Sequence, residues 1–159
     1  MFLNKRKTIF LISVCLLVFL LTINDIKSQE LKVVDGDTIH LNSEKIRFTG
    51  IDTPELEQTC IKDGIKNSCG LIAKQILINK IGNNNVECIR EGRDQYQRTL
   101  AECFVNDESL SSFLVKSGYA FAYRKYSKKF IKDEDYARVK KIGMWSMKFE
   151  YPWDYRRNN

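Results

Sequence analysis

The chain has 159 residues, which is enough for one folded domain and short for two. Hydrophobic residues make up 43% of it and charged residues 29%, a composition that excludes a disordered or fibrous chain. The 26 Lys and Arg outnumber the 20 Asp and Glu, but half of the net charge of +6 lies in the first 28 residues, so charge alone is weak evidence for an acidic partner. A single long apolar run excludes a polytopic membrane protein.

The first 28 residues are predicted to be a targeting segment. Basic residues at positions 5–7 precede an almost wholly apolar run from Thr8 to Ile23, the pattern of a secretory signal. The run is slightly short for a membrane span of roughly 20 residues, and no clean cleavage site follows it. A cleaved signal peptide and a retained N-terminal membrane anchor are therefore both open. In either case we expect export, with residues 29–159 forming one periplasmic, extracellular or membrane-anchored domain outside the cytoplasm.

Strand-like runs and turn residues come first in the exported region, and helical patterns follow. We expect strands over 31–34, 37–41 and 46–51, a polar turn at 42–45 and a polar loop over 54–68. A helix over 69–81 follows, with Leu71, Ile72 and Ile78 among its apolar positions. A hairpin of 86–90 with 99–105 and helices over 109–117 and about 132–142 complete the chain. This order predicts a mainly β chain with α-helices (α+β), compatible with a five-stranded OB-fold barrel with three helices.

Four cysteines lie in the exported region, and an oxidising compartment favours disulfides between them. A zinc site is a poor alternative, because the chain has no CxxC motif and His40 is its only histidine. Folding the hairpin with Cys88 opposite Cys103 also places Val86 opposite Val105 on one face. We therefore expect a Cys88–Cys103 bond, which leaves Cys60 to pair with Cys69; four free thiols are the alternative.

Two acidic tetrapeptides, Asp35-Gly36-Asp37-Thr38 and Asp52-Thr53-Pro54-Glu55, flank the predicted second and third strands. If the turn pairs Leu41 with Ile46, Asp37 faces Gly50, and Asp52 lies diagonal to Asp37 within roughly 7–8 Å. Each tetrapeptide alone is typical of a polar turn, but the two together predict a cation site.

The ligand types at this site favour a hard cation. Asp37 and Asp52 offer carboxylate oxygens, Thr53 adds a backbone carbonyl, and Glu55 adds a third carboxylate. Such a set favours Ca²⁺ or Mg²⁺ over a transition metal, and the ligands alone do not separate these two ions.

Arg47 and Arg98 are candidates for binding phosphate, because a guanidinium matches phosphate oxygens with paired donors. Simple strand alternation places Arg47 on the face opposite Asp37. The alternative for either arginine is a solvated surface charge.

These motifs, with the turn Asp94-x-Tyr96-x-Arg98 and the late Gly143-Met144-Trp145, resemble the staphylococcal nuclease-like (thermonuclease) family. The resemblance spans nearly all of the exported region and implies an OB-fold barrel with three helices. It further implies Ca²⁺-dependent hydrolysis of DNA and RNA that leaves 3′-phosphate ends.

By position, the resemblance assigns roles to six residues. Asp37 and Asp52 would ligate Ca²⁺ with the carbonyl of Thr53. Glu55 would act as general base or orient the attacking water. The residues that would hold the scissile phosphate are Arg47 and Arg98.

The chain departs from the family pattern in two places: its loop over 42–45 is shorter than in the best-known member, and the turn that carries Arg98 differs at one residue. Gln97 stands where the family usually has Gly, so we expect a different shape for the turn that carries Arg98. Two aromatic residues near basic ones, Tyr96 and Tyr126, are expected to be exposed and to stack on bases. Trp153 is expected to fix the C-terminal tail to the domain.

The sequence as a whole predicts an exported, disulfide-bonded, monomeric calcium-dependent nuclease with DNA and RNA as substrates. One alternative is a non-catalytic OB-fold protein that binds single-stranded nucleic acid. A second is a structural protein tethered to the membrane through residues 1–28.

Overall fold

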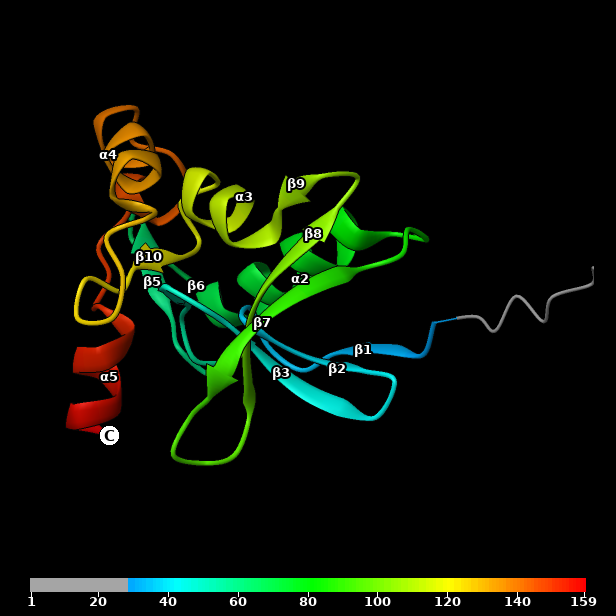
Figure 1. Cartoon of the computed structure of the whole chain (residues 1–159). Coiled ribbons are helices and arrows are strands. Elements are labelled where there is room, and N and C mark those ends of the chain that lie inside the picture. Colours follow the sequence, from blue (N-terminus) through cyan, green and yellow to red (C-terminus); the bar gives the residue numbers. More distant parts are fainter. Residues whose placement is uncertain (1–28) are drawn as a thin grey trace, which may run out of the picture.

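The computed structural model describes residues 29–159, and the targeting segment predicted for residues 1–28 lies outside that range. The described chain is a mixed α+β domain with a central sheet in the order β1-β2-β3-β8-β7 (Figure 1). β3 and β8 are parallel, the other neighbours are antiparallel, and β9 pairs with β8. The strands of this sheet are β1 (Leu31–Val33), β2 (Thr38–Leu41), β3 (Glu44–Phe48), β7 (Glu87–Arg93), β8 (Thr99–Val105) and β9 (Glu108–Ser109).

Two short strand pairs and the helices complete the described part. Strand β4 (Ile51–Asp52) pairs with β10 (Phe121–Ala122), and β5 (Cys60–Lys62) pairs with β6 (Ile65–Asn67). In residues 29–159 none of the helices is long and apolar enough to span a bilayer. They are α2 (Cys69–Ile81), α3 (Leu110–Lys116), α4 (Ile131–Val139), the 3₁₀ turn η1 (Gly143–Ser146) and α5 (Pro152–Asn158).

The α+β class is as predicted, but the details differ. Across the described residues the sheet is open, because no ladder joins the outer strands β1 and β7, and a fourth α-helix, α5, follows the three predicted ones. The predicted loop over 54–68 contains the β5–β6 hairpin, whose residues are mostly exposed. Both missed elements are short and have no strong apolar period, so the pattern of the sequence did not reveal them.

The β2–β3 hairpin has a tighter turn than predicted. Asn42 and Ser43 have φ angles of +48° and +67°, as a two-residue type I′ turn requires. Leu41 therefore pairs with Glu44, and the predicted pairing of Leu41 with Ile46 is wrong by two residues. Because side chains alternate with a period of two, the same residues still face the core.

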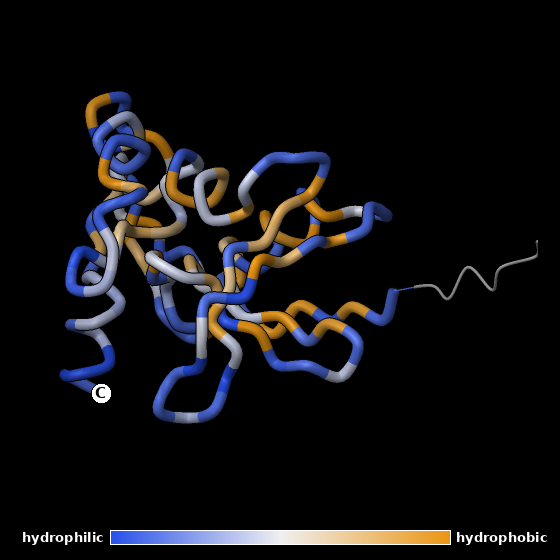
Figure 2. The backbone as a smooth tube through the Cα atoms, in the orientation of Figure 1, coloured by the Kyte–Doolittle hydropathy of each residue, from blue (hydrophilic) through white to orange (hydrophobic). Residues whose placement is uncertain are grey.

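The core lies between the sheet and the helices. Ile39, Ile46 and Phe48 of the first hairpin are buried against Leu77 of α2 and Leu114 of α3. Figure 2 shows that apolar positions concentrate on the strands and on α2, whereas the β7–β8 turn and α5 are hydrophilic.

The buried face of α2 is not the one expected from its apolar residues. Ala73, Leu77 and Ile81 point inward, whereas Leu71 is 54% exposed and Ile78 is 37% exposed.

Both predicted disulfides are present. Cys88 and Cys103 are direct partners in the β7–β8 ladder, with their Cα atoms 4.1 Å apart. Cys60 in β5 is bonded to Cys69 at the start of α2, with a Cα–Cα distance of 5.9 Å. The first bond cross-links β7 and β8 of the central sheet, and the second cross-links the β5–β6 hairpin to α2.

We expect the double substitution of Cys88 and Cys103 by Ala to reduce the free energy of unfolding by about 3 kcal/mol, because the bond closes a loop of roughly 15 residues. Urea denaturation under oxidising conditions measures the loss. Reductant should destabilise the double variant further, through the remaining Cys60–Cys69 bond. Equal stability of oxidised wild type and variant would contradict the expectation.

One carboxylate links three strands of the central sheet. The Glu44 carboxylate of β3 accepts hydrogen bonds from Arg90 of β7, with Nη2–Oε2 at 2.5 Å, and from the Thr99 hydroxyl of β8 at 2.7 Å. The pKa of Glu44 is lowered, first by its hydrogen bond from Arg90 and then by the one from Thr99. A carboxyl whose pKa is lowered by folding stabilises the protein above its ordinary pKa, and this contribution is lost as pH falls through the folded-state value.

Arg90→Gln should therefore reduce the free energy of unfolding at pH 7 by about 0.5–1 kcal/mol, the range of exposed ion pairs. The difference from wild type should shrink as pH falls through the lowered pKa of Glu44, because the protonated carboxyl no longer forms an ion pair with Arg90. Urea unfolding at pH 7 and pH 3 measures both values. Arg138→Gln, which removes an exposed pair with Asp135 on α4, is the control. An undiminished Arg90→Gln effect at pH 3 would refute the role of Glu44.

Candidate active site

Two buried carboxylates share one guanidinium at the end of the first hairpin. Asp37 lies just before β2 and is 2% exposed; Asp52 ends β4 and is 0% exposed. Arg47 of β3 bridges them, with Nη1 at 2.5 Å from Asp37 Oδ1 and Nη2 at 2.7 Å from Asp52 Oδ1. The structure thus brings the two predicted metal ligands together with one of the predicted phosphate-binding arginines.

The turn before β2 explains how Arg47 reaches Asp37. The N–H groups of Val34 and Asp35 both donate to the carbonyl of Thr38, and the N–H of Asp37 donates to Asp35 Oδ1 at 3.0 Å. Asp37 therefore lies in a turn, where strand alternation does not apply. The prediction that Arg47 lies on the opposite face from Asp37 is wrong for this reason.

Burial dominates the electrostatics of the pair. It raises the pKa of Asp37 to about 6, against the opposing effect of Arg47. It also raises the pKa of Asp52, against a hydrogen bond from Arg156. The buried backbone N–H of Thr53 donates to Asp37 Oδ2 at 3.0 Å. Both carboxylates are thus removed from water, and their ionised forms require nearby cations.

Arg156 of α5 is a site residue that the sequence analysis missed. Its Nη2 lies 2.7 Å from Asp52 Oδ2, and its Nη1 lies 3.2 Å from Asp52 Oδ1 and 2.7 Å from Glu55 Oε1. Burial alone lowers the pKa of Arg156, but the hydrogen bonds to Asp52 and Glu55 raise it above its ordinary value. The only sequence signal was a pair of arginines in the tail, and nothing in it indicates a contact with the acidic motif.

Two glycines let neighbouring segments approach the Asp52–Glu55 loop closely. A Cβ atom on Gly70, in the first turn of α2, would lie 1.8 Å from the carbonyl oxygen of Glu55. A Cβ atom on Gly36 would lie 2.8 Å from the hydroxyl oxygen of Thr53. The loop is therefore held directly against α2 and the turn before β2.

Gln58 connects this loop to the tail. Its buried side chain accepts a hydrogen bond from the Glu55 N–H at 3.1 Å and donates one to the Glu150 carbonyl at 2.7 Å. Glu55 and the segment that leads into α5 are thus fixed relative to each other.

The turn between β7 and β8 carries Arg98. Asp94 accepts hydrogen bonds from the N–H groups of Tyr96 and Arg98, and its other carboxylate oxygen accepts one from Arg98 Nε at 2.6 Å. Gln97 has φ +61°, the left-handed conformation that Gly takes more easily. The turn therefore adopts a glycine-like shape with strain of about 1–2 kcal/mol at Gln97.

Arg98 lies in the turn directly before β8 and does not share the partners of Arg47. The parallel ladder pairs Arg47 with Leu100, two residues after Arg98. Across residues 29–159 no hydrogen bond or ion pair joins Arg98 to Asp37, Asp52 or Glu55. The structure brings the other five predicted catalytic and metal-binding residues together, whereas Arg98 is paired with Asp94.

Exposed aromatic and basic residues lie near these elements. Tyr96 is 71% exposed and Tyr126 is 70% exposed, as expected.

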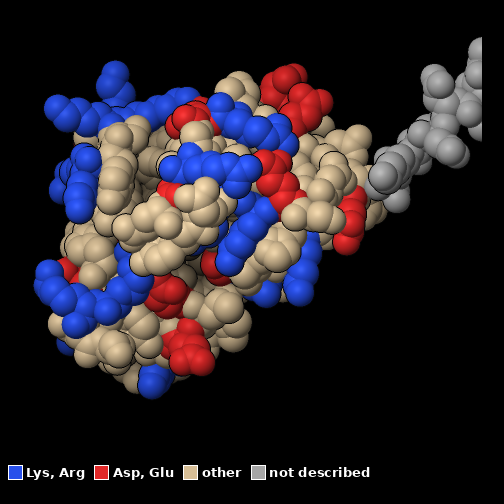
Figure 3. All heavy atoms as spheres, turned by 60° about the horizontal axis from the view of Figure 1, so that its bottom comes forward, with Lys and Arg blue, Asp and Glu red and all other residues tan. Residues whose placement is uncertain are grey.

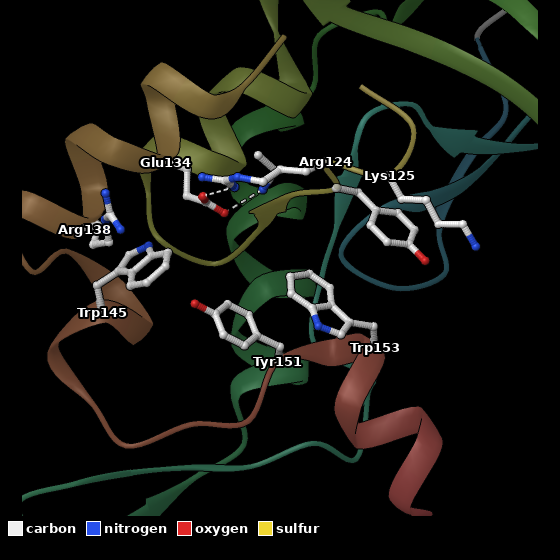
Figure 4. Close-up of a pocket in the computed structure, with 9 residues that line it drawn as sticks. Arg124, Lys125, Glu134, Arg138, Trp145, Tyr151 and Trp153 are labelled. Atoms are coloured by element: carbon white, nitrogen blue, oxygen red, sulfur yellow. Dashed lines mark hydrogen bonds and ion pairs between the residues drawn. The ribbon is translucent and has the colours of Figure 1, made fainter. Parts of the chain in front are cut away.

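A pocket of about 500 Å³ opens between the 122–125 segment, α4 and the tail, and Figure 4 shows the aromatic rings and basic groups that line it. Among its lining residues are Arg124, Lys125, Trp145, Tyr151 and Trp153. Figure 3 shows basic side chains spread over much of one face, with acidic ones between them.

The acidic pair fits a hard divalent cation. In the described part of the chain no group of three or more His, Cys, Asp or Glu side chains is placed to hold a metal ion. Two buried carboxylates remain, Asp37 and Asp52, with the backbone of Thr53 beside them. Mg²⁺ at phosphate sites usually binds through one or two carboxylates and keeps water and substrate oxygens as its other ligands, and Ca²⁺ takes carboxylates, backbone carbonyls and water.

Comparison with known proteins shows where this chain has relatives. Residues 45–147 match the family described as staphylococcal nuclease homologue. The chain is 33% identical over 122 residues to an uncharacterized endonuclease of Haemophilus influenzae, covering 72% of this chain and 64% of the relative. It is 32% identical over 136 residues to the SPbeta prophage-derived endonuclease YokF of Bacillus subtilis, covering 72% and 42%. It is 26% identical over 151 residues to a micrococcal nuclease of Shigella flexneri, covering 84% and 82%. The chain thus spans less than two thirds of the first two relatives and most of the third.

Proposed function

Because the chain belongs to the family of staphylococcal nuclease homologues, we propose that it is a calcium-dependent nuclease that hydrolyses DNA and RNA and leaves 3′-phosphate ends. The observation that carries this proposal is the buried pair Asp37 and Asp52 on the guanidinium of Arg47. Buried carboxylates favour a divalent cation, and a neighbouring arginine favours a phosphate group. The two kinds of side chain together therefore suit a site that binds both. Membership of this family also supports the predicted OB fold, although the sheet is open across the described residues.

Asp37, Asp52 and the carbonyl of Thr53 would hold Ca²⁺, with Mg²⁺ as the other candidate ion. When bound, the cation would neutralise the charge that grows on the phosphoryl oxygens. The protein's contribution is to orient the carboxylates: Arg47 donates to both of them, and the N–H of Thr53 donates to Asp37.

Arg47 and Arg98 would bind the scissile phosphate. Asp94 binds Nε of Arg98, so across residues 29–159 the two terminal nitrogens of Arg98 have no protein partner and can donate to a phosphate. Glu55 would accept a proton from the attacking water. The water oxygen bonds to phosphorus, the bond from phosphorus to the 5′-oxygen breaks, and that oxygen takes up a proton.

Tyr96 and Tyr126 would stack on bases of the bound strand. Both rings have a cation close by: Arg98 lies 5.6 Å from the Tyr96 ring centre and Lys125 lies 5.5 Å from that of Tyr126. We propose further that the chain is exported through residues 1–28, since the two disulfides suit an oxidising compartment. We also propose that it acts as a monomer.

The full chain should cleave plasmid DNA and RNA in the presence of Ca²⁺ and stop when a chelator is added; parallel reactions with Mg²⁺ identify the preferred ion. Glu55→Gln should slow cleavage about 10²- to 10⁴-fold, because it removes the proton acceptor. Glu57→Gln, two residues away and exposed, is the matched control. Binding of single strands without cleavage under any of these conditions would favour the non-catalytic alternative.

Loss of either arginine should cost at least as much rate as the loss of Glu55, since charge stabilisation is the larger effect in such sites. We expect Arg47→Ala and Arg98→Ala each to lower kcat/KM at least about 10²-fold. Arg90→Ala, in the same sheet but paired with Glu44, is the control. Turnover close to wild type in either variant would refute its role in holding the phosphate.

A further inference from the structure

Arg156 occupies a position that the proposed reaction leaves unexplained. It comes from α5 and makes hydrogen bonds to both oxygens of Asp52 and to one oxygen of Glu55. We infer that the Arg156 guanidinium is a built-in counter-ion that takes the place of the divalent cation in the metal-free protein and withdraws when the metal binds. This inference rests on the proposed function, because it concerns the same carboxylates.

The hydrogen bonds of the two aspartates show the overlap. Arg47 occupies Asp37 Oδ1, and the N–H of Thr53 occupies Asp37 Oδ2. Asp52 Oδ1 is shared by Arg47 and Arg156, whereas Asp52 Oδ2 accepts from Arg156 at 2.7 Å. A guanidinium within hydrogen-bond distance of these oxygens repels a divalent cation that would use them. Metal binding and the Arg156 contacts therefore compete.

Of the two arginines on Asp52, Arg156 is the one that can leave. Arg47 lies on β3, between β2 and β8, and its side chain is 17% exposed. Arg156 lies on α5, outside the sheet, and its side chain is 38% exposed. A rotamer change can move its guanidinium into solvent without disturbing the sheet.

The helix that carries Arg156 is firmly attached to the domain. The Trp153 ring stacks on Tyr151 at 4.6 Å and is parallel to Tyr123 at 5.9 Å, and Figure 4 shows Tyr151 and Trp153 at the start of the helix. Gln58 ties the preceding Glu150 to the Glu55 loop. The position of Arg156 is thus set by packing, and its side chain alone needs to move.

The Arg156 contacts have one consequence for the metal-free protein and one for metal affinity. Arg156 neutralises the buried Asp52 and holds Glu55 beside it, so it stabilises the protein without metal. The same contacts must be broken when the metal binds, and they lower its affinity. Linkage makes these effects reciprocal.

The full chain, freed of metal with a chelator that is then removed, is titrated with Ca²⁺ by calorimetry as wild type, Arg156→Gln and Arg157→Gln. Arg157 makes an ion pair with Asp154 and is 74% exposed, so its variant removes the same charge without touching the site. Arg156→Gln should bind Ca²⁺ at least about fivefold more tightly than wild type, and its metal-free form should have a lower Tm. Arg157→Gln should match wild type in both measurements.

Unchanged or weaker Ca²⁺ binding by Arg156→Gln would overturn the inference. Should that variant fold poorly, Arg156→Lys, which keeps the charge but cannot bridge Asp52 and Glu55 in the same way, should shift the affinity in the same direction. Cleavage and Ca²⁺ binding by wild type test the proposed function separately. Binding by wild type with no gain in Arg156→Gln would overturn the inference alone, and no binding by either protein would overturn both.

Discussion

The burial of two negative charges constrains this structure more than any other feature. Asp37 and Asp52 lie inside the domain, where water cannot solvate them, and each needs a cation within a few ångströms. Arg47 reaches them from the central sheet and Arg156 from the last helix, so residues far apart in the chain meet at one point. The site therefore forms only when the first hairpin, the Glu55 loop and the tail are all in place.

The tail has its own hydrophobic core, which accounts for its position. Phe121 of β10 packs against Trp145, Phe149 and Tyr151, with ring centres 5.1–5.4 Å apart. These aromatic contacts bring the segment after η1 back over β4 and β10, next to Asp52. Trp153 fixes the tail, as expected from the sequence, and its packing also positions the arginine three residues later.

The parts of the fold that the sequence predicted are those governed by local patterns. Strand alternation and a shared register paired Cys88 with Cys103, and α2 ends at Ile81 as predicted. The predicted register of β2 and β3 was wrong, because Asn42 and Ser43 adopt the left-handed conformation and make the turn shorter than expected. For the site, the spacing of the two acidic motifs predicted that Asp37 and Asp52 lie close together, whereas only the family resemblance placed Arg47 with them. The contact between Arg156 and Asp52 spans 104 positions and leaves no local pattern.

The Cys60–Cys69 bond has a consequence for how this domain can vary. It closes the β5–β6 hairpin at its base, one residue before the Gly70 that packs on the Glu55 carbonyl. The hairpin tip around Gly64 is open, and a Cβ atom there would meet nothing within 4 Å. Insertions or deletions at that tip would change only the hairpin beyond the disulfide and would not displace Glu55. The tip is therefore the place where the domain tolerates changes in chain length and grafted segments.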